Sequence, residues 1–284
     1  MLNGGTLLCT TMSGHLLAVN AAGKLLSQRK DHTKYVVGVT VHHNREVHGG
    51  NTLIATAGWD NKVHLYYLAS STISDPDIDL PSPAATITLP TKPEALLFLQ
   101  HPDTWTPILL LSRTDSNFIY FYDTATPDPR LLGKQNLAPH SNAWVAFTPS
   151  ALALCPTDPT LLAVGTNSIP HMKLLIVRLR FPPLESSAAS SEPPSSTLTP
   201  TSLLDDTLVP ETQASQARAA LALAEREDAA MLIHATTMAP QTAYSTPAVA
   251  WRPDGSGVWV NGDDGAVRGI EAKTGKVCRL LCAW

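Results

Sequence analysis

The side chains that most often carry chemistry in proteins include histidine, and this sequence holds one dense group of histidines. The group comprises His32, His42, His43 and His48, which lie within seventeen residues. Imidazole nitrogens bind transition metals, so this group is a candidate zinc site. Adjacent residues of a strand point to opposite faces, however, so His42 and His43 do not simply share one ion. We therefore expect histidines of loops and rims, and no metal site.

Other signatures of catalysis and cofactor binding are absent. The sequence has no Gly-x-Ser-x-Gly motif and no glycine-rich phosphate loop of either common type. Ser, His and Asp are abundant, but their spacing nominates no triad, which is recognised by geometry. Cys278 and Cys282 have no nearby second pair of ligands, and a spacing of four places both on one face of a strand. We expect these cysteines to pack, and we predict no catalytic residue, no cofactor and no metal.

The composition describes a chain that is large enough for a substantial core. It has 284 residues, of which 44% are hydrophobic, and a formal net charge of −4. Neither half is basic, so we expect no nucleic-acid partner. No apolar run has the length of a membrane span, and no secretory signal is visible, so we expect no membrane partner. The four cysteines give no disulfide framework. We expect an intracellular protein, cytoplasmic or nuclear.

Short apolar runs recur along the chain, and Gly, Asn, Asp or Pro bounds each of them. Most are four to eight residues long, which is too short for typical helices. Many short strands joined by turns indicate an all-β, antiparallel sandwich or propeller. The expected strands cover residues 6–10, 16–19, 24–28, 35–41, 53–57, 63–68, 85–89, 96–99, 108–111, 118–122, 151–154, 161–164, 174–179, 231–237, 248–251, 258–260, 267–270 and 276–284.

A repeated outline distinguishes a propeller from a sandwich. Residues 53–68 form an apolar strand, a turn with Asp60, and an alternating strand that ends in aromatic residues. Similar outlines recur at residues 108–124 and 258–272, with weaker copies at 7–20 and 161–179. The strand ends are separated by 47, 56, 55 and 93 residues. The first three spacings suit one four-stranded blade each, and the last contains an insertion.

These segments resemble the WD40 repeats of β-propellers. Asp31-His32 stands where the family has Gly-His, and Tyr122-Asp123 stands in the Trp-Asp place. Further matching segments are 21–24, 251–255, 263–265 and 273–276. The resemblance covers roughly residues 5–181 and 230–284, is closest to fungal WD-repeat proteins, and departs from the family in having no Trp-Asp at the strand end where the family has it. It implies an all-β, WD40-type β-propeller with about five four-stranded blades, the first of them incomplete.

The resemblance also implies a structural role for four polar residues. In WD40 blades an Asp in a turn accepts a hydrogen bond from a loop His, which reaches a strand hydroxyl that bonds an aromatic residue. The matching positions here are His32, Thr56, Asp60 and Tyr66. We expect these four to form a hydrogen-bonded tetrad within one blade, because buried polar groups need partners.

Two further features of the family are weaker in this chain. The Trp-Asp-x-Arg box of ligase-adaptor propellers is reduced at residues 177–180 to its final Arg, so we do not expect that role. Trp251, Trp259 and Trp284 could anchor partners on the surface, but packing within the blades is the simpler interpretation.

The composition divides the chain into three segments. Residues 1–181 hold most of blades one to four. Residues 182–229 form an insertion, in which residues 182–213 contain 7 Ser, 5 Thr and 6 Pro and are expected to be disordered. Residues 214–229 are strong helix formers without Gly or Pro, so a short helix is expected there. Residues 230–284 complete blade four and form blade five.

These expectations favour a non-enzymatic scaffold that binds other proteins through the loops of a rigid propeller. One alternative is an enzyme with a site that lines the central channel, which convergent charged residues with shifted pKa values would favour. Another is a truncated fragment of a larger seven-bladed protein, because the first blade begins at its second strand. Such an open blade edge would also promote self-association.

Overall fold

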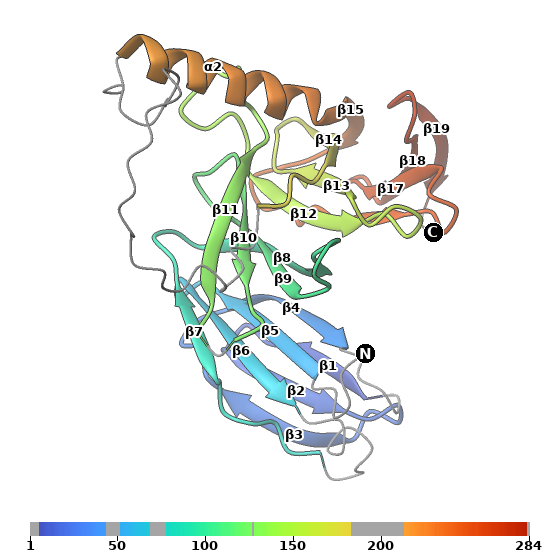
Figure 1. Cartoon of the computed structure of the whole chain (residues 1–284). Coiled ribbons are helices and arrows are strands. Elements are labelled where there is room, and N and C mark those ends of the chain that lie inside the picture. The colour runs from blue at the N-terminus through green and yellow to red at the C-terminus, as the bar shows by residue number, and fades with distance from the viewer. Residues whose placement is uncertain (1–5, 44–51, 69–77, 127, 183–212, 283–284) are drawn as a thin grey trace, which may run out of the picture.

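The computed structural model describes residues 6–43, 52–68, 78–126, 128–182 and 213–282, and within them the strands form five antiparallel sheets (Figure 1). Each sheet is built from strands that are consecutive in the chain. This is the arrangement of propeller blades, and it confirms the predicted all-β propeller.

The first two sheets come from the first third of the chain. The first has three strands in the order β1-β2-β3, and the second has four in the order β4-β5-β6-β7. Their bounds are β1 Leu7–Thr10, β2 His15–Val19, β3 Leu25–Lys30, β4 Val36–His43, β5 Thr52–Gly58, β6 Lys62–Leu68 and β7 Ala85–Thr88.

The remaining three sheets have four strands each and follow the same order. The third contains β8 Pro93–Gln100, β9 Pro107–Arg113, β10 Phe118–Asp123 and β11 Arg130–Asn136. The fourth contains β12 Pro149–Leu154, β13 Leu161–Thr166, β14 His171–Arg178 and β15 Met231–Pro240. The fifth contains β16 Val249–Trp251, β17 Gly257–Asn261, β18 Ala266–Glu271 and β19 Val277–Cys282.

Local sequence explains most of these strands. The central strand β5 is buried along its whole length and is correspondingly apolar. Its turn into β6 places Asn61 at φ 63°, a left-handed conformation that Asn tolerates better than most residues. One strand, β11, was not among the expected strands, because its sequence RLLGKQN combines polar residues with a central Gly.

The sheets lie side by side in chain order along an open arc, with the first sheet (blue) and the fifth sheet (red) at its two ends (Figure 1). The inner strands β4, β8, β12 and β16 contact one another in series. Strand β5, the second strand of its sheet, contacts β8, the inner strand of the next sheet. Strand β1 contacts β4 in the same way, so β1 occupies the second position of its own sheet. The described part of the first sheet therefore has no inner strand, as the sequence predicted.

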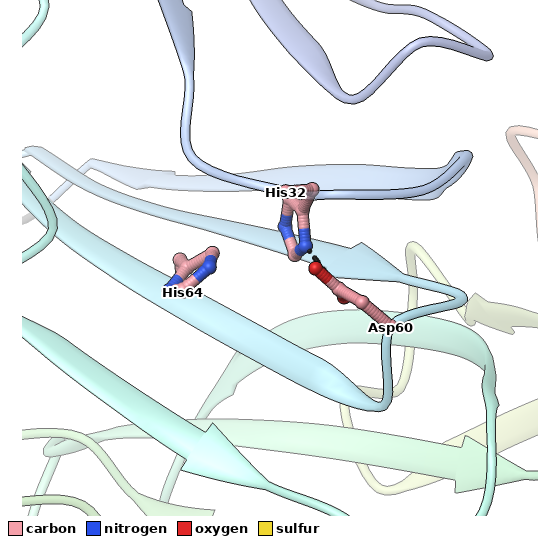
Figure 2. Close-up of side chains that lie close together, drawn as sticks. All are labelled: His32, Asp60 and His64. Atoms are coloured by element: carbon pink, nitrogen blue, oxygen red, sulfur yellow. Dashed lines mark hydrogen bonds and ion pairs between the residues drawn. The ribbon is translucent and has the colours of Figure 1, made fainter.

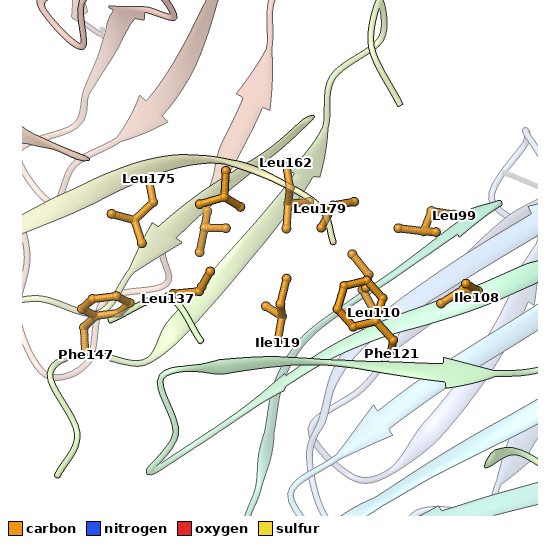
Figure 3. Close-up of a cluster of buried hydrophobic side chains, with 12 residues drawn as sticks. Leu99, Ile108, Leu110, Ile119, Phe121, Leu137, Phe147, Leu162, Leu175 and Leu179 are labelled. Carbon is orange, nitrogen blue, oxygen red and sulfur yellow. The ribbon is translucent and has the colours of Figure 1, made fainter. Parts of the chain in front are cut away.

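The packing between neighbouring sheets forms the core. Figure 3 shows one cluster, in which side chains of the third sheet face side chains of the fourth. Leu110, Ile119 and Phe121 are completely buried against Leu162 and Leu175. Each sheet thus covers its apolar face with the next sheet, which is the usual source of stability in repeat architectures.

The expected helix is confirmed as α2, Gln213–Ala229, which leads directly into β15. Near its end the buried Glu227 accepts a hydrogen bond of 3.0 Å from the backbone N–H of Asn136, in β11. The helix is therefore fastened to the third sheet while the chain pairs within the fourth. Of the stretch 182–213, for which disorder was expected, residues 183–212 lie outside the described residues.

Replacing Leu110 by Ala should destabilise the protein by about 2–5 kcal/mol, because it leaves a cavity between the third and fourth sheets. Leu131→Ala is the matched control, since Leu131 belongs to the same sheet but is 49% exposed. Urea unfolding monitored by circular dichroism measures both. Equal, small effects of the two substitutions would contradict the proposed core.

Candidate functional site

A buried polar network lies between the first and second sheets, where the loop after β3 meets the turn between β5 and β6. His32 is 3% exposed and forms two hydrogen bonds. Its Nδ1 lies 2.9 Å from Asp60 Oδ1, and its Nε2 lies 2.9 Å from Thr56 Oγ1. A carboxylate only accepts hydrogen bonds, so Nδ1 donates to Asp60 (Figure 2).

Asp60 fastens the loop to the turn through both of its oxygens. Oδ2 accepts a hydrogen bond of 2.9 Å from the backbone N–H of Thr33. Burial acts to raise the pKa of Asp60, but the hydrogen bonds from Thr33 and His32 outweigh burial, so this pKa lies below its ordinary value. The charged form of Asp60 is therefore the form that the fold stabilises.

Tyr66 completes the network, and it adds a partner that the sequence did not indicate. Its hydroxyl donates to Asp31 Oδ2 at 3.1 Å. Asp31 also accepts two hydrogen bonds of 2.9 Å from Arg29, a bidentate pair. Burial raises the pKa of Tyr66, as does the Asp31 carboxylate, while hydrogen bonding with Thr56 opposes this rise. The four predicted residues thus lie together, extended by Asp31 and Arg29.

His64, in β6, is a second histidine in this network that the sequence did not single out. Its ring lies 4.4 Å from that of His32, and its Nδ1 is 2.8 Å from Thr86 Oγ1. Its buried Nε2 makes no hydrogen bond of good geometry within the described part of the chain. Burial lowers the pKa of His64, and the neighbouring His32 lowers it further, so the neutral ring is favoured.

One atom from each of His32, Asp60 and His64 lies within 4.8 Å of the others, so these residues are the candidates for a metal ion. Zinc needs three or four ligands at about 2 Å. Both nitrogens of His32 already have protein partners, so an ion would have to displace Asp60 or Thr56 from the ring. The arrangement serves the packing of a loop on a turn better than it serves coordination.

A similar set of hydrogen bonds from a loop to an aspartate occurs at the fifth sheet. Asp263 follows β17 and accepts hydrogen bonds from the Ser245 hydroxyl and from the backbone N–H of Thr242, the latter at 3.2 Å. Thr242 and Ser245 belong to the loop before β16, as His32 belongs to the loop before β4. Among the described residues, an aspartate in a turn thus holds the preceding loop at the second sheet and again at the fifth.

The other histidines of the early group lie elsewhere. His42 and His43 end β4 and both line a cavity of about 550 Å³, formed where β4, β8 and β12 end. Both histidines thus reach one cavity, and the expectation that they do not share a metal ion stays a prediction. His48 lies outside the described residues. His101, Trp105 and Phe181 also line the cavity, and no sequence motif indicated them, because Phe181 comes from a different blade than the loop that carries His101 and Trp105.

The expectations for the cysteines and tryptophans have mixed outcomes. Cys278 is exposed rather than packed, and Arg252 donates a hydrogen bond to its sulfur at 3.0 Å. Trp251 packs against the fourth sheet, and its Nε1–H donates to the carbonyl of Ala153 at 2.9 Å. The ring of Trp259 lies 4.9 Å from the Arg252 guanidinium. The side chain of Cys282 and all of Trp284 lie outside the described part.

Sheets of consecutive strands along an arc and loops fastened by buried polar networks define a WD40-type β-propeller. The chain belongs to the UCP007778 beta-propeller domain family, whose model matches residues 3–281. No curated protein matches the sequence. Within the described residues, no helix has both the length and the apolar character that crossing a membrane requires.

Solved propellers resemble the structure along nearly its whole length. The Dos1 propeller matches with a TM-score of 0.57 and 12% identity, over 98% of this chain and 56% of that chain. Saccharomyces cerevisiae Sqt1 matches with a TM-score of 0.57 and 14% identity, over 100% and 62%. A chain of the mitotic checkpoint complex matches with a TM-score of 0.55 and 12% identity, over 99% and 64%. The chain spans less than two thirds of each.

Replacing Asp60 by Ala should lower the free energy of unfolding by about 1–3 kcal/mol, because it leaves the buried His32 Nδ1 without its acceptor and removes the hydrogen bond to the Thr33 N–H. Asp103→Ala is the control, since Asp103 is an exposed aspartate whose side chain makes no hydrogen bond within the described residues. Thermal melting compares the two. A melting temperature equal to that of the parent would contradict the role of Asp60.

The lowered pKa values predict that acid weakens this network. Burial acts to raise the pKa of Asp31, but hydrogen bonds from Arg29 and Tyr66 lower it overall, as others do for Asp60. The unfolded chain then binds more protons, so the stability contribution is present above a pH of about 4 and is lost as pH falls through the native values. Urea unfolding at about pH 6 and pH 3 measures this. An Asp31→Asn, Asp60→Asn variant should lose less stability than the parent, and an equal loss would refute the prediction.

Proposed function

We propose that the chain acts as a non-enzymatic scaffold that binds other polypeptides through the uncovered ends of its arc of blades. The polar network supports this interpretation, because its His and Asp side chains are engaged in fastening loops. When the polar side chains of a rigid propeller hold its loops in place, the propeller offers binding surfaces rather than reactive groups.

The observation that carries the proposal is the exposure of the fifth sheet. In β7, β11 and β15, the outer strands of the three preceding sheets, at least one side chain is buried. In β19 all the side chains that the structure describes, residues 277–281, are exposed. They include Val277, Leu280 and Leu281 at 44%, 56% and 43% exposure. Apolar side chains on an uncovered sheet are typical of surfaces that bind protein.

The first sheet offers a complementary feature at the other end of the arc. Its order β1-β2-β3 leaves β1 at the inner edge, where the other sheets have a further strand. Among the described residues β1 pairs with a strand on one side only, and the backbone N–H and C=O groups of such an edge pair readily with an added strand. A polypeptide that supplies this strand would complete the sheet and cover part of the arc.

The two alternatives are distinguishable from this proposal. A channel enzyme needs convergent charged groups, whereas the described residues that line the 550 Å³ cavity include no Asp, Glu, Lys or Arg. A fragment of a longer propeller is consistent with the 56% and 62% of matched chains that this chain spans. In that case the covering polypeptide is the remainder of the same protein.

The uncovered ends predict self-association of the purified chain. Size-exclusion chromatography with light scattering should give a mass above 30.4 kDa that rises with protein concentration. A Leu280→Lys, Leu281→Lys variant should shift the mass towards the monomer, because charge opposes burial of that strand. Leu221→Lys, at a 58% exposed leucine of α2, is the matched control and should change nothing. A 30.4 kDa monomer at every concentration would contradict binding through the open ends.

A further inference from the structure

The cavity at the ends of β4, β8 and β12 has walls that are largely apolar and aromatic, with polar side chains from His42, His43, Gln100, His101 and Thr160. Trp105 and Pro102 come from the loop after β8, Pro159 from the loop after β12, and Phe181 from the segment after β14. Because three sheets contribute, the cavity is a property of the assembled arc. Its volume of about 550 Å³ lies within the range of sites that bind small molecules and short peptide segments.

His101 supplies a hydrogen-bond donor whose orientation is determined by its surroundings. The side chain is 3% exposed, and its Nδ1 accepts a hydrogen bond of 3.2 Å from the backbone N–H of Asp103. An accepting Nδ1 carries no proton, so the proton of the neutral ring is on Nε2. Nε2 has no protein partner within the described residues, and the ring packs edge-on against Phe181 at 5.4 Å. His101 therefore brings to the cavity lining a ring N–H that has no acceptor among the described residues.

Trp105 is held at this cavity in an uncommon conformation. Its φ of 58° is unusual for a bulky residue, and two backbone hydrogen bonds of 2.9 Å, between His101 and Trp105 and between His101 and Thr106, close the loop that carries it. The side chain is nevertheless 60% exposed. Its indole N–H is a second donor without a protein acceptor in the described part of the chain. An exposed, preorganised tryptophan beside an apolar cavity is typical of a binding site.

We propose that this cavity binds a proline-rich segment of a partner protein in the polyproline II conformation. Such a segment presents pyrrolidine rings, which pack on aromatic side chains, and carbonyl groups that no internal hydrogen bond satisfies. Proline has no N–H, so the ligand offers acceptors where the cavity offers the donors of His101 and Trp105. The absence of Asp, Glu, Lys and Arg from the described lining matches a ligand without charge. The proposal rests on the scaffold function but uses a different surface from the arc ends.

Calorimetric titration of the 284-residue chain with a blocked decaproline peptide tests the proposal. Binding in the micromolar to millimolar range is expected, whereas a blocked Gly-Ser peptide of equal length should not bind. Trp105→Ala should weaken binding about tenfold or more. Trp144→Ala is the matched control, because Trp144 is 86% exposed but does not line the cavity, and it should leave binding unchanged. His101→Asn keeps an acceptor near the Nδ1 position, removes the Nε2 donor, and should weaken binding about threefold to tenfold.

Several results would overturn the proposal. One is no decaproline binding by a chain with the parent melting temperature, and another is equal weakening by Trp105→Ala and Trp144→Ala. Binding of a neutral aromatic compound such as indole without binding of decaproline would make the cavity a small-molecule site. Binding that appears only after Pro193 and Pro194 are replaced by Ser would assign it to the chain's own proline-rich stretch. None of these results depends on self-association, so failure here and failure of the scaffold function are separable.

Discussion

Contact between neighbouring sheets is the constraint on which the rest of the structure depends. A single four-stranded sheet cannot cover its own apolar faces, so each must pack on the next, as the cluster around Leu110 and Phe121 shows. The inner strands β4, β8, β12 and β16 are consequently held in series. The same requirement explains why the last sheet, which has no successor in the described chain, exposes Leu280 and Leu281.

The polar network is a second, local constraint. It determines the path of a loop into the next strand rather than the burial of apolar surface. Apolar contacts do not specify how a loop enters the next strand, whereas the charged Asp60 binds the His32 ring and the Thr33 N–H at set positions. Removing a carboxylate from water is unfavourable, and the lowered pKa shows that its hydrogen bonds more than offset this cost. At the fifth sheet Asp263 holds the preceding loop in a similar way, with a serine hydroxyl as the donor in place of a histidine ring.

The fold was largely predictable because strand length, turn residues and a repeat of about 50 residues are local signals. The strand β11 escaped, since RLLGKQN gains its strand character only from pairing with β10. His32, Thr56, Asp60 and Tyr66 were predicted because they match a repeat pattern. Asp31 stands where that pattern has Gly, and His64 matches no part of it, so the roles of these two residues depend on packing. The cavity was not predictable, because it arises where three blades meet.

The pairing of β14 with β15 has a consequence for how this chain can change in length. Val177 in β14 lies opposite Met231 in β15, so the chain leaves the fourth sheet and returns to it at neighbouring points. The residues between these two positions connect the strands. The entropic cost of closing such a connection rises only logarithmically with its length, by about 0.6 kcal/mol for each doubling. Evolution can therefore lengthen or shorten the stretch between residues 182 and 213, or place a whole domain there, while the register of every blade and the packing of Leu179 and Glu227 stay unchanged.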